Sequence, residues 1–231
     1  MDQTLPDAGE RRPGPRRQRA TRRRGERTRQ EILDATLRVI ARDGVRRVTH
    51  RAVAQEAGVN LSLTTYYFVD LSDMICRAFE RFVDIGYPEV ERRWEEVFGH
   101  LEALDPAWRD SETSRIRVRD HVIDRMVDDI GGKLATQPDW IAAKQHFFFE
   151  ALLDPRLAAL AEDYRRRLVA PFERLCRILG SADPELDAEL LFANFVRFEH
   201  EALSDSGNGR LDREWVRRAL ARMLDWILRH G

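Results

Sequence analysis

Polar side chains gather between positions 47 and 67, and their types suit contact with nucleic acid. They include hydroxyls, two amides, an imidazole and two guanidinium groups, with Glu56 as the one acid among them. Hydroxyls and amides at a helix start suit phosphate oxygens and base edges, and an arginine can make two hydrogen bonds to guanine. We therefore expect DNA contacts from Asn60, Ser62, Thr64, Thr65 and Tyr66. The expected set also includes their neighbours Arg47, Thr49, His50, Arg51, Leu61 and Tyr67, although an aromatic residue at the position of Tyr67 is more typical of the core.

Two short helices joined by a tight turn would position these side chains. Thr49 is suited to cap the first helix, and Ala54 is small enough to lie where the two helices cross. Gly58 can adopt the positive φ of the turn, and Asn60 is suited to cap a second helix over 61–67. This pattern predicts a helix-turn-helix.

A longer helix is expected before this pair. From Ile32 to Ala41 the apolar side chains recur at the spacing of one helical face, and Gly44 is typical of a helix end. The three helices would form a small DNA-binding domain over 27–70.

This segment resembles the TetR family of bacterial transcriptional regulators over residues 27–75. The resemblance rests on matches spread along that segment, which are Val48-Thr49, Ala54, Ala57-Gly58-Val59 and Tyr67-Phe68. It implies a homodimer in which each subunit places its second short helix in the major groove. It also implies a helical C-terminal domain that binds a small molecule, whose binding releases the DNA.

The resemblance also implies roles for single residues. Thr49 matches a common phosphate contact, Arg51 matches a position that reads a base in some members, and residues 64–67 lie where the family contacts DNA. The chain departs from the family at Ser62-Leu63, where Gly or Pro and then a hydroxyl residue are frequent, and at Leu71, where many members carry Lys. One phosphate contact is then missing, and Arg46, Arg47 or the arginines further upstream could replace it.

The charge of the chain divides near residue 70. The formal net charge is −1, yet residues 1–70 hold 15 basic and 9 acidic side chains, and residues 71–231 hold 24 basic and 31 acidic ones. Ten arginines lie within 11–29, with Glu26 as the one acid. Because prolines and glycines interrupt this start, we expect a disordered basic arm over 1–26, which is either a solubilising tail or a contact to phosphates or a minor groove.

Beyond residue 70 the pattern stays helical and predicts an all-α chain. We expect an effector-binding and dimerisation domain over 71–231, and its turn signals predict helices near 71–86, 88–103, 112–130, 138–153, 155–179, 185–204 and 211–229.

Aromatic and apolar side chains of this domain are candidates for a pocket and an interface. For an apolar or aromatic effector we expect contacts from Trp94, Phe98, Trp140, His146, Phe147 and Glu150. Large apolar side chains on the last two helices are either core or interface. Since the family pairs these helices across a two-fold axis, we favour a dimer interface of Leu191, Phe195, Phe198, Ala202, Trp215, Ala219, Met223 and Trp226.

The sequence favours a regulator over an enzyme. It lacks a glycine-rich phosphate loop, a Gly-x-Ser-x-Gly motif and a Cys-x-x-Cys motif, so we expect no catalysis and no cofactor. No apolar stretch reaches the roughly 18 residues of a membrane helix, and two isolated cysteines fit a cytoplasmic protein. The enzyme alternative is a helical metalloprotein that uses His146, Glu150, Glu199 and His200.

We therefore predict a ligand-responsive repressor that binds a palindromic operator as a homodimer and is released by a small-molecule effector. An activator, or a repressor without a small-molecule ligand, is the alternative within the same class.

Overall fold

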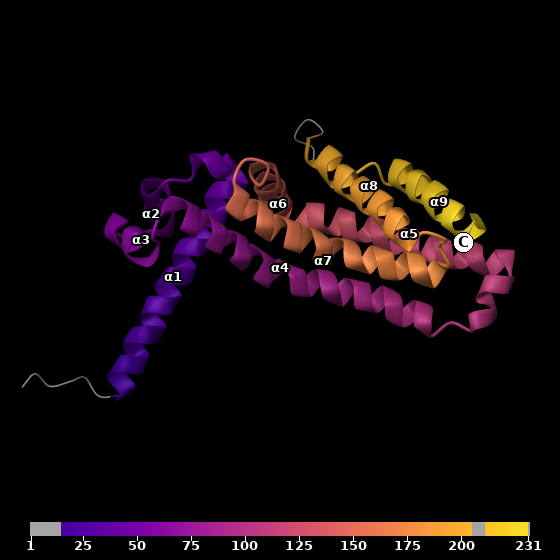
Figure 1. The fold of residues 1–231 in the computed structure, drawn as a ribbon, viewed down its shortest axis with the longest axis horizontal. Helices are drawn as coiled ribbons and strands as arrows, with labels where there is room; N and C mark the ends of the chain where they lie inside the picture. The colour runs from indigo at the N-terminus through magenta and orange to yellow at the C-terminus, as the bar shows by residue number, and fades with distance from the viewer. Residues whose placement is uncertain (1–14, 205–210, 231) are drawn as a thin grey trace, which may run out of the picture.

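The computed structural model describes residues 15–204 and 211–230, and every regular element in these ranges is a helix (Figure 1). The prediction of an all-α fold is therefore confirmed for this part of the chain. A small N-terminal unit lies at one end of an elongated molecule, and a larger helical domain extends away from it.

The N-terminal unit consists of α1 (Pro15–Asp43), the 3₁₀ turn η1 (Val45–Arg47), α2 (His50–Ala57) and α3 (Leu61–Tyr67). Gly44 ends α1 with φ +83°, and Gly58 has φ +65° in the turn between α2 and α3. Both angles belong to the left-handed region, which glycine adopts without a steric cost. The helix-turn-helix predicted from the sequence is present.

The first helix begins earlier than expected. Residues 15–26 belong to α1, whereas the sequence predicted a disordered arm over 1–26; residues 1–14 lie outside the described residues. Arginine is a good helix former, Pro15 suits the first helical position, and one glycine in a helix interior costs only about 1 kcal/mol. A helix already packed from Ile32 onward can therefore extend back through Gly25.

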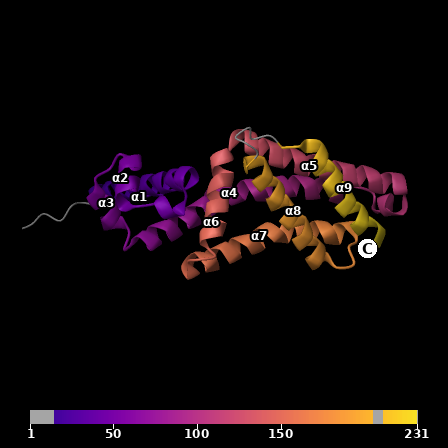
Figure 2. The same ribbon diagram turned by 90° about the horizontal axis from the view of Figure 1, so that it is seen from above.

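The C-terminal domain is built from long helices. Its elements are α4 (Leu71–Glu102), the 3₁₀ turn η2 (Pro106–Asp110), α5 (Glu112–Thr136), α6 (Pro138–Glu150), α7 (Pro155–Leu179), α8 (Pro184–Ser204) and α9 (Arg213–His230). Seen from above, α4 leaves the N-terminal unit and runs along the larger domain. Helix α6 lies across the direction of α4, where the two units meet (Figure 2).

Two expected helix breaks are absent. α4 continues through Pro88, where a break was predicted, and α5 continues through Gly131-Gly132 to Thr136. Proline removes one backbone donor, but the helix is held on both sides of it because Phe82, Tyr87 and Val97 are buried. Tertiary packing outweighs the local signal at both places.

Aromatic side chains join α4 to α6 and α7. The Phe79 ring lies 4.8 Å from Phe147 of α6 and 5.9 Å from Tyr164 of α7, measured between ring centroids. Phe82 stacks on Trp140 at 4.1 Å. These contacts fix α6 against the helix that leads to the N-terminal unit.

Candidate DNA interface and ligand pocket

The start of α2 has the cap that the sequence predicted. The Thr49 hydroxyl accepts a hydrogen bond from the Ala52 amide at 3.0 Å, which satisfies one backbone donor of the first turn. Thr49 and Arg51 remain exposed, and His50 is half-buried. The cap therefore leaves the outer surface of this turn open to a phosphate group.

The outer face of α3 is polar and aromatic. Ser62, Thr65 and Tyr66 are exposed, Tyr66 to 78%, and Leu61 is exposed to 50%. Asn60 precedes the helix, and its side chain makes no capping hydrogen bond, so its amide is available for another partner. Such a face suits a groove that presents donors, acceptors and thymine methyl groups.

Thr64 differs from the expectation of a DNA contact, because it is fully buried. Its hydroxyl donates to the Leu61 carbonyl at 2.7 Å and lies 3.1 Å from Nδ1 of His50. Thr64 and His50 thus join α3 to α2. Tyr67 is half-buried and meets the Tyr66 ring edge to face, while Phe68 is 1% exposed and belongs to the core.

Four arginines of this unit form two pairs with different surroundings. Arg38 and Arg42 of α1 both donate to Glu56 of α2, at 2.8 and 3.0 Å, and these bonds lower the pKa of that carboxyl group. Arg47 and Arg51 are exposed, and within the described residues neither has a carboxylate partner. The first pair holds α1 to α2, and the second pair is available to an external anion.

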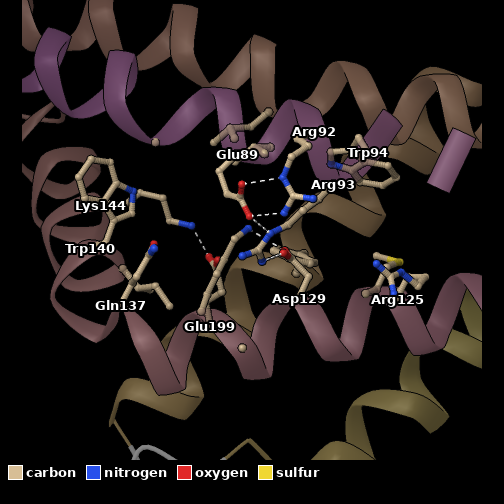
Figure 3. A pocket seen from close by; sticks show the side chains of 18 of the residues that line it. Glu89, Arg92, Arg93, Trp94, Arg125, Asp129, Gln137, Trp140, Lys144 and Glu199 are labelled. Carbon is tan, nitrogen blue, oxygen red and sulfur yellow. Dashed lines mark hydrogen bonds and ion pairs between the residues drawn. The ribbon is translucent and has the colours of Figure 1, made fainter. Parts of the chain in front are cut away.

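A cavity of about 400 Å³ lies inside the C-terminal domain, between α4, α5, α6, α7 and α8. Its walls include the aromatic side chains of Trp94, Trp140, Tyr164, Phe172, Phe192 and Phe195. Figure 3 shows charged side chains reaching into the same space. The cavity is therefore aromatic with a polar strip, which is typical of small-molecule sites.

The polar strip alternates in charge. Glu199 of α8 is 1% exposed and pairs with Lys144 of α6 (Figure 3). Asp129 of α5 accepts from Lys133 at 2.6 Å and also pairs with Arg93 of α4. Every one of these charges has an opposite charge beside it, as burial requires.

The strip continues along α4. Glu89 accepts from Arg93 at 2.8 Å and from Arg92 at 2.9 and 2.7 Å. Together these hydrogen bonds lower the pKa of the Glu89 carboxyl group to about 2, and the bonds from Arg92 contribute most. Burial, followed by the nearby Glu199 charge, raises the pKa of Tyr164, so the Tyr164 phenol stays protonated.

Only part of the expected effector set lines this cavity. Trp94 and Trp140 do, whereas Phe98 and Phe147 are buried beside it and His146 and Glu150 lie at the junction with the N-terminal unit. A usable signal was present in the composition, since Lys133 and Lys144 are the only two lysines among 39 basic residues and both line the cavity.

The junction between the two units is made by the end of α6. A Cβ atom built on Gly44 would lie 3.4 Å from the His146 ring, and Arg46 pairs with Glu150 at 3.4 Å. Helix α1 packs along α6 as well. One short helix thus carries Trp140 and Lys144 in the cavity wall and His146 and Glu150 against the N-terminal unit.

The residues proposed for the interface divide by exposure. Four of them, Leu191, Phe195, Phe198 and Ala202, are buried inside the domain, so they cannot meet a second molecule without a rearrangement. Trp215 and Trp226 are exposed to 40% and 60%, while Ala219 and Met223 are half-buried. Exposed Leu186 and Leu190 of α8 extend the apolar surface, and a hollow lies between Leu190, Met223 and Trp226.

The four residues of the metalloprotein alternative are not brought together. His146 and Glu150 lie at the junction, whereas Glu199 pairs with Lys144 in the cavity. Among the described residues no three His, Cys, Asp or Glu side chains form a group that could hold a metal ion. In the same ranges no helix has the length and apolar character needed to cross a membrane.

Sequence comparisons match both units. Residues 32–74 match the family described as bacterial regulatory proteins, tetR family, and residues 117–226 match the tetracyclin repressor-like C-terminal domain. No curated protein sequence matches the chain.

Several solved structures share the fold. A protein classed as a transcriptional regulator from Streptomyces coelicolor A3(2) is 25% identical with a TM-score of 0.57, over 85% of this chain and 98% of that one. Another so classed, from Saccharomonospora viridis and solved with choline, is 18% identical with a TM-score of 0.60, over 87% and 96%. The multidrug binding protein EbrR, solved with ethidium, is 23% identical with a TM-score of 0.56, over 85% and 97%.

Proposed function

Since the chain belongs to the TetR family of bacterial transcriptional regulators, we propose that it is a repressor that binds a palindromic operator as a homodimer and is released by a small-molecule effector. The observation that carries this proposal is the pairing of two surfaces in one chain. The exposed helix α3, with Arg47 and Arg51 nearby that have no carboxylate partner among the described residues, is connected through α1 and α6 to a cavity of about 400 Å³.

DNA recognition would fall to α3 and to the start of α2. Asn60, Ser62, Thr65 and Tyr66 face outward and would contact base edges and phosphates, and Arg51 would read a guanine. Thr49 and Arg47 would hold the flanking phosphates. Two such helices must lie about 34–36 Å apart, one turn of DNA, to read a palindrome.

The dimer would form through the outer face of α8 and α9. This face offers Leu186, Leu190, Trp215 and Trp226 as exposed apolar side chains, together with Met223 beside a hollow that a partner side chain could fill. Large exposed apolar side chains gathered on two neighbouring helices are typical of an interface. The buried side chains of Leu191, Phe195, Phe198 and Ala202 would then pack beneath this face without contacting the partner.

The effector would occupy the cavity of the C-terminal domain. Its aromatic walls favour a flat or apolar body, and the Lys144–Glu199 pair offers both a donor and an acceptor to a polar group. The ligands of two structural neighbours, choline and ethidium, are organic cations that aromatic walls can hold. An effector with an apolar or aromatic body and one polar or cationic group fits these features.

Release would be transmitted through α6. A ligand that contacts Trp140 or competes for Glu199 would shift α6, whose far end holds Gly44 and Arg46 of the N-terminal unit. A ligand shifts such an equilibrium only by its difference in affinity for the two states, about 1.4 kcal/mol for each tenfold. Release therefore depends on the difference between the effector's affinity for the free protein and its affinity for the DNA-bound protein.

The proposal is tested by selecting random DNA duplexes with purified protein and by measuring its mass in solution. We expect enrichment of a palindrome with half-site centres about 10 base pairs apart, or a multiple of that, and a mass twice 27.0 kDa. A monomer, or a pool without a common sequence, would contradict it. Leu190→Arg should dissociate the dimer, whereas Leu152→Arg, at an exposed apolar position on another face, should not.

The direction of regulation needs a second assay. Transcription from a promoter that carries the selected operator should fall when the protein is added and return when the effector is added. A rise in transcription on adding the protein would favour the activator alternative.

A further inference from the structure

The sequence of the first turns of α1 is rich in arginine. The sequence places Arg16, Arg17, Arg19, Arg22, Arg23, Arg24, Arg27 and Arg29 in this helix, with Glu26 as the one acid before Glu31. Like charges three and four residues apart destabilise a helix by about 0.2–0.5 kcal/mol per pair. A polyanion would remove this repulsion.

Three of these arginines are unpaired. Arg22, Arg23 and Arg24 are exposed, and no carboxylate in the described ranges lies within ion-pair distance of them. Many arginines of the C-terminal domain differ in this respect, as Arg92, Arg165 and Arg174 each pair with two carboxylates. Unpaired arginines therefore occur at the start of α1 just as they do at Arg47 and Arg51.

The position of this segment is fixed by its contact with the end of α3. A Cβ built on Gly25 would lie 3.3 Å from the Tyr67 hydroxyl, and the Arg29 guanidinium lies over the Phe68 ring at 5.7 Å. Residues before Gly25 run on past this contact and project from the molecule (Figure 1). At 1.5 Å per residue, Pro15–Arg24 extends about 15 Å beyond it.

We propose that Arg22, Arg23 and Arg24 of α1 form a second DNA-binding element, which holds the sugar-phosphate backbone next to the groove that α3 enters. The occupant is duplex DNA, because the segment begins beside the recognition helix and its charge is complementary to phosphate. Successive helical residues differ by 100°, so Arg22, Arg23 and Arg24 point in directions that span about 200° around the helix axis. Together they cover somewhat more than half of the circumference of the helix.

This inference rests on the proposed function, since it requires that α3 bind an operator. It adds a contact that reads no base and lengthens the protected DNA. Each phosphate contact contributes about 0.9 to the slope of log K against log salt concentration.

The test compares two full-length triple variants with equal loss of charge. Arg22→Gln/Arg23→Gln/Arg24→Gln alters the proposed element, and Arg117→Gln/Arg166→Gln/Arg177→Gln alters exposed arginines of the C-terminal domain. Affinity for the selected operator is measured by fluorescence anisotropy between 50 and 300 mM salt, on a duplex trimmed to the two half-sites and on one with ten flanking base pairs at each end.

For the first variant we expect the salt slope to fall by about two to five units per dimer and affinity at 200 mM salt to drop about tenfold or more. The gain in affinity that flanking DNA gives the wild-type protein should also disappear. The second variant should match the wild-type protein in both respects.

Equal slopes and equal flanking gains for all three proteins would overturn this inference while leaving the operator-binding function intact. Failure of the wild-type protein to select any sequence would overturn both. Circular dichroism confirms that the variants are folded before binding is measured.

Discussion

The imidazole of His146, on α6, lies against the backbone of Gly44 at the end of α1, where φ is +83°. The first residue belongs to the helix that forms part of the cavity wall, and the second begins the turn that leads to the helix-turn-helix. Arg46 and Glu150 make an ion pair beside them. This junction is one connection between a helix that lines the cavity and the N-terminal unit.

His146→Ala should weaken the coupling between effector and DNA without removing either binding site. Coupling free energies are typically 1–3 kcal/mol, so we expect the effector-induced loss of operator affinity to shrink from about 5–150-fold to a few-fold. The measurement is operator affinity with and without saturating effector. Phe149→Ala, on the same helix but 62% exposed, serves as the control and should retain the full response.

Arg51→Ala should relax the preference at one base pair in each half-site. An arginine bound to guanine contributes about 1–3 kcal/mol of discrimination, which the variant would lose at that position only. Anisotropy titrations across single-base operator variants measure the profile. Arg42→Ala, whose guanidinium already pairs with Asp43 and Glu56, should leave the profile unchanged, and an unchanged profile for Arg51→Ala would exclude a base-reading role.

Lys144→Met should lower the free energy of unfolding by about 3–5 kcal/mol, because it leaves the buried Glu199 carboxylate without its cation. The double variant Lys144→Met/Glu199→Leu should recover most of that loss, since no unpaired charge remains. Urea denaturation at fixed protein concentration compares the three proteins. A double variant as unstable as the single one would show that the pair does not act through its charges.

Gly86→Ala should destabilise the protein, although alanine ordinarily stabilises a helix relative to glycine. A Cβ at Gly86 would lie 2.7 Å from Cε2 of Trp140, whose ring is held by stacking on Phe82. We expect a loss of about 1–3 kcal/mol from this overpacking. Gly99→Ala, on the same helix with no atom within 4 Å of the added carbon, should gain up to about 1 kcal/mol in the same denaturation experiment.

Stability should decline as the pH falls from 7.5 to 5.5, in part because of His121. Its ring lies 3.9 Å from that of His100, and burial, then the charges of His100 and Arg125, lower its pKa against the opposing effect of Asp124. The unfolded chain therefore binds the proton more readily, so protonation below the ordinary histidine pKa of about 6.5 favours unfolding. His121→Gln should lose less stability over this interval, and equal losses would show that another group is responsible.

The sequence was sufficient for the helix-turn-helix because local chemistry determines it. Thr49 caps a helix, Gly58 permits a left-handed turn and Ala54 is small at a crossing, and each of these properties can be recognised without a partner. The burial of Thr64 could not be predicted, because helical periodicity does not say which side of a seven-residue helix faces α2.

The cavity was harder to anticipate because five helices distant in sequence build it. Nothing local distinguishes Trp140, which lines the cavity, from Phe147, which is buried beside it. His146 and Glu150 share the helix of Lys144 but project toward the DNA-binding unit. Only the positions of α1 and α8 around α6 decide which face of that helix meets which neighbour.

Helix α1 spans both the arginine-rich segment and the Gly44 turn without interruption, and its buried part begins at Ile32. If α1 tilts as a rigid rod about Ile32, a tilt of about 5° would move Arg22 and Asp43, each about 15 Å away, by about 1 Å in opposite directions. Phosphates held at one end would resist a displacement imposed at the other. The effector concentration needed for release would then rise with the length of DNA beside the operator, so two promoters with the same palindrome and different surroundings would respond at different doses.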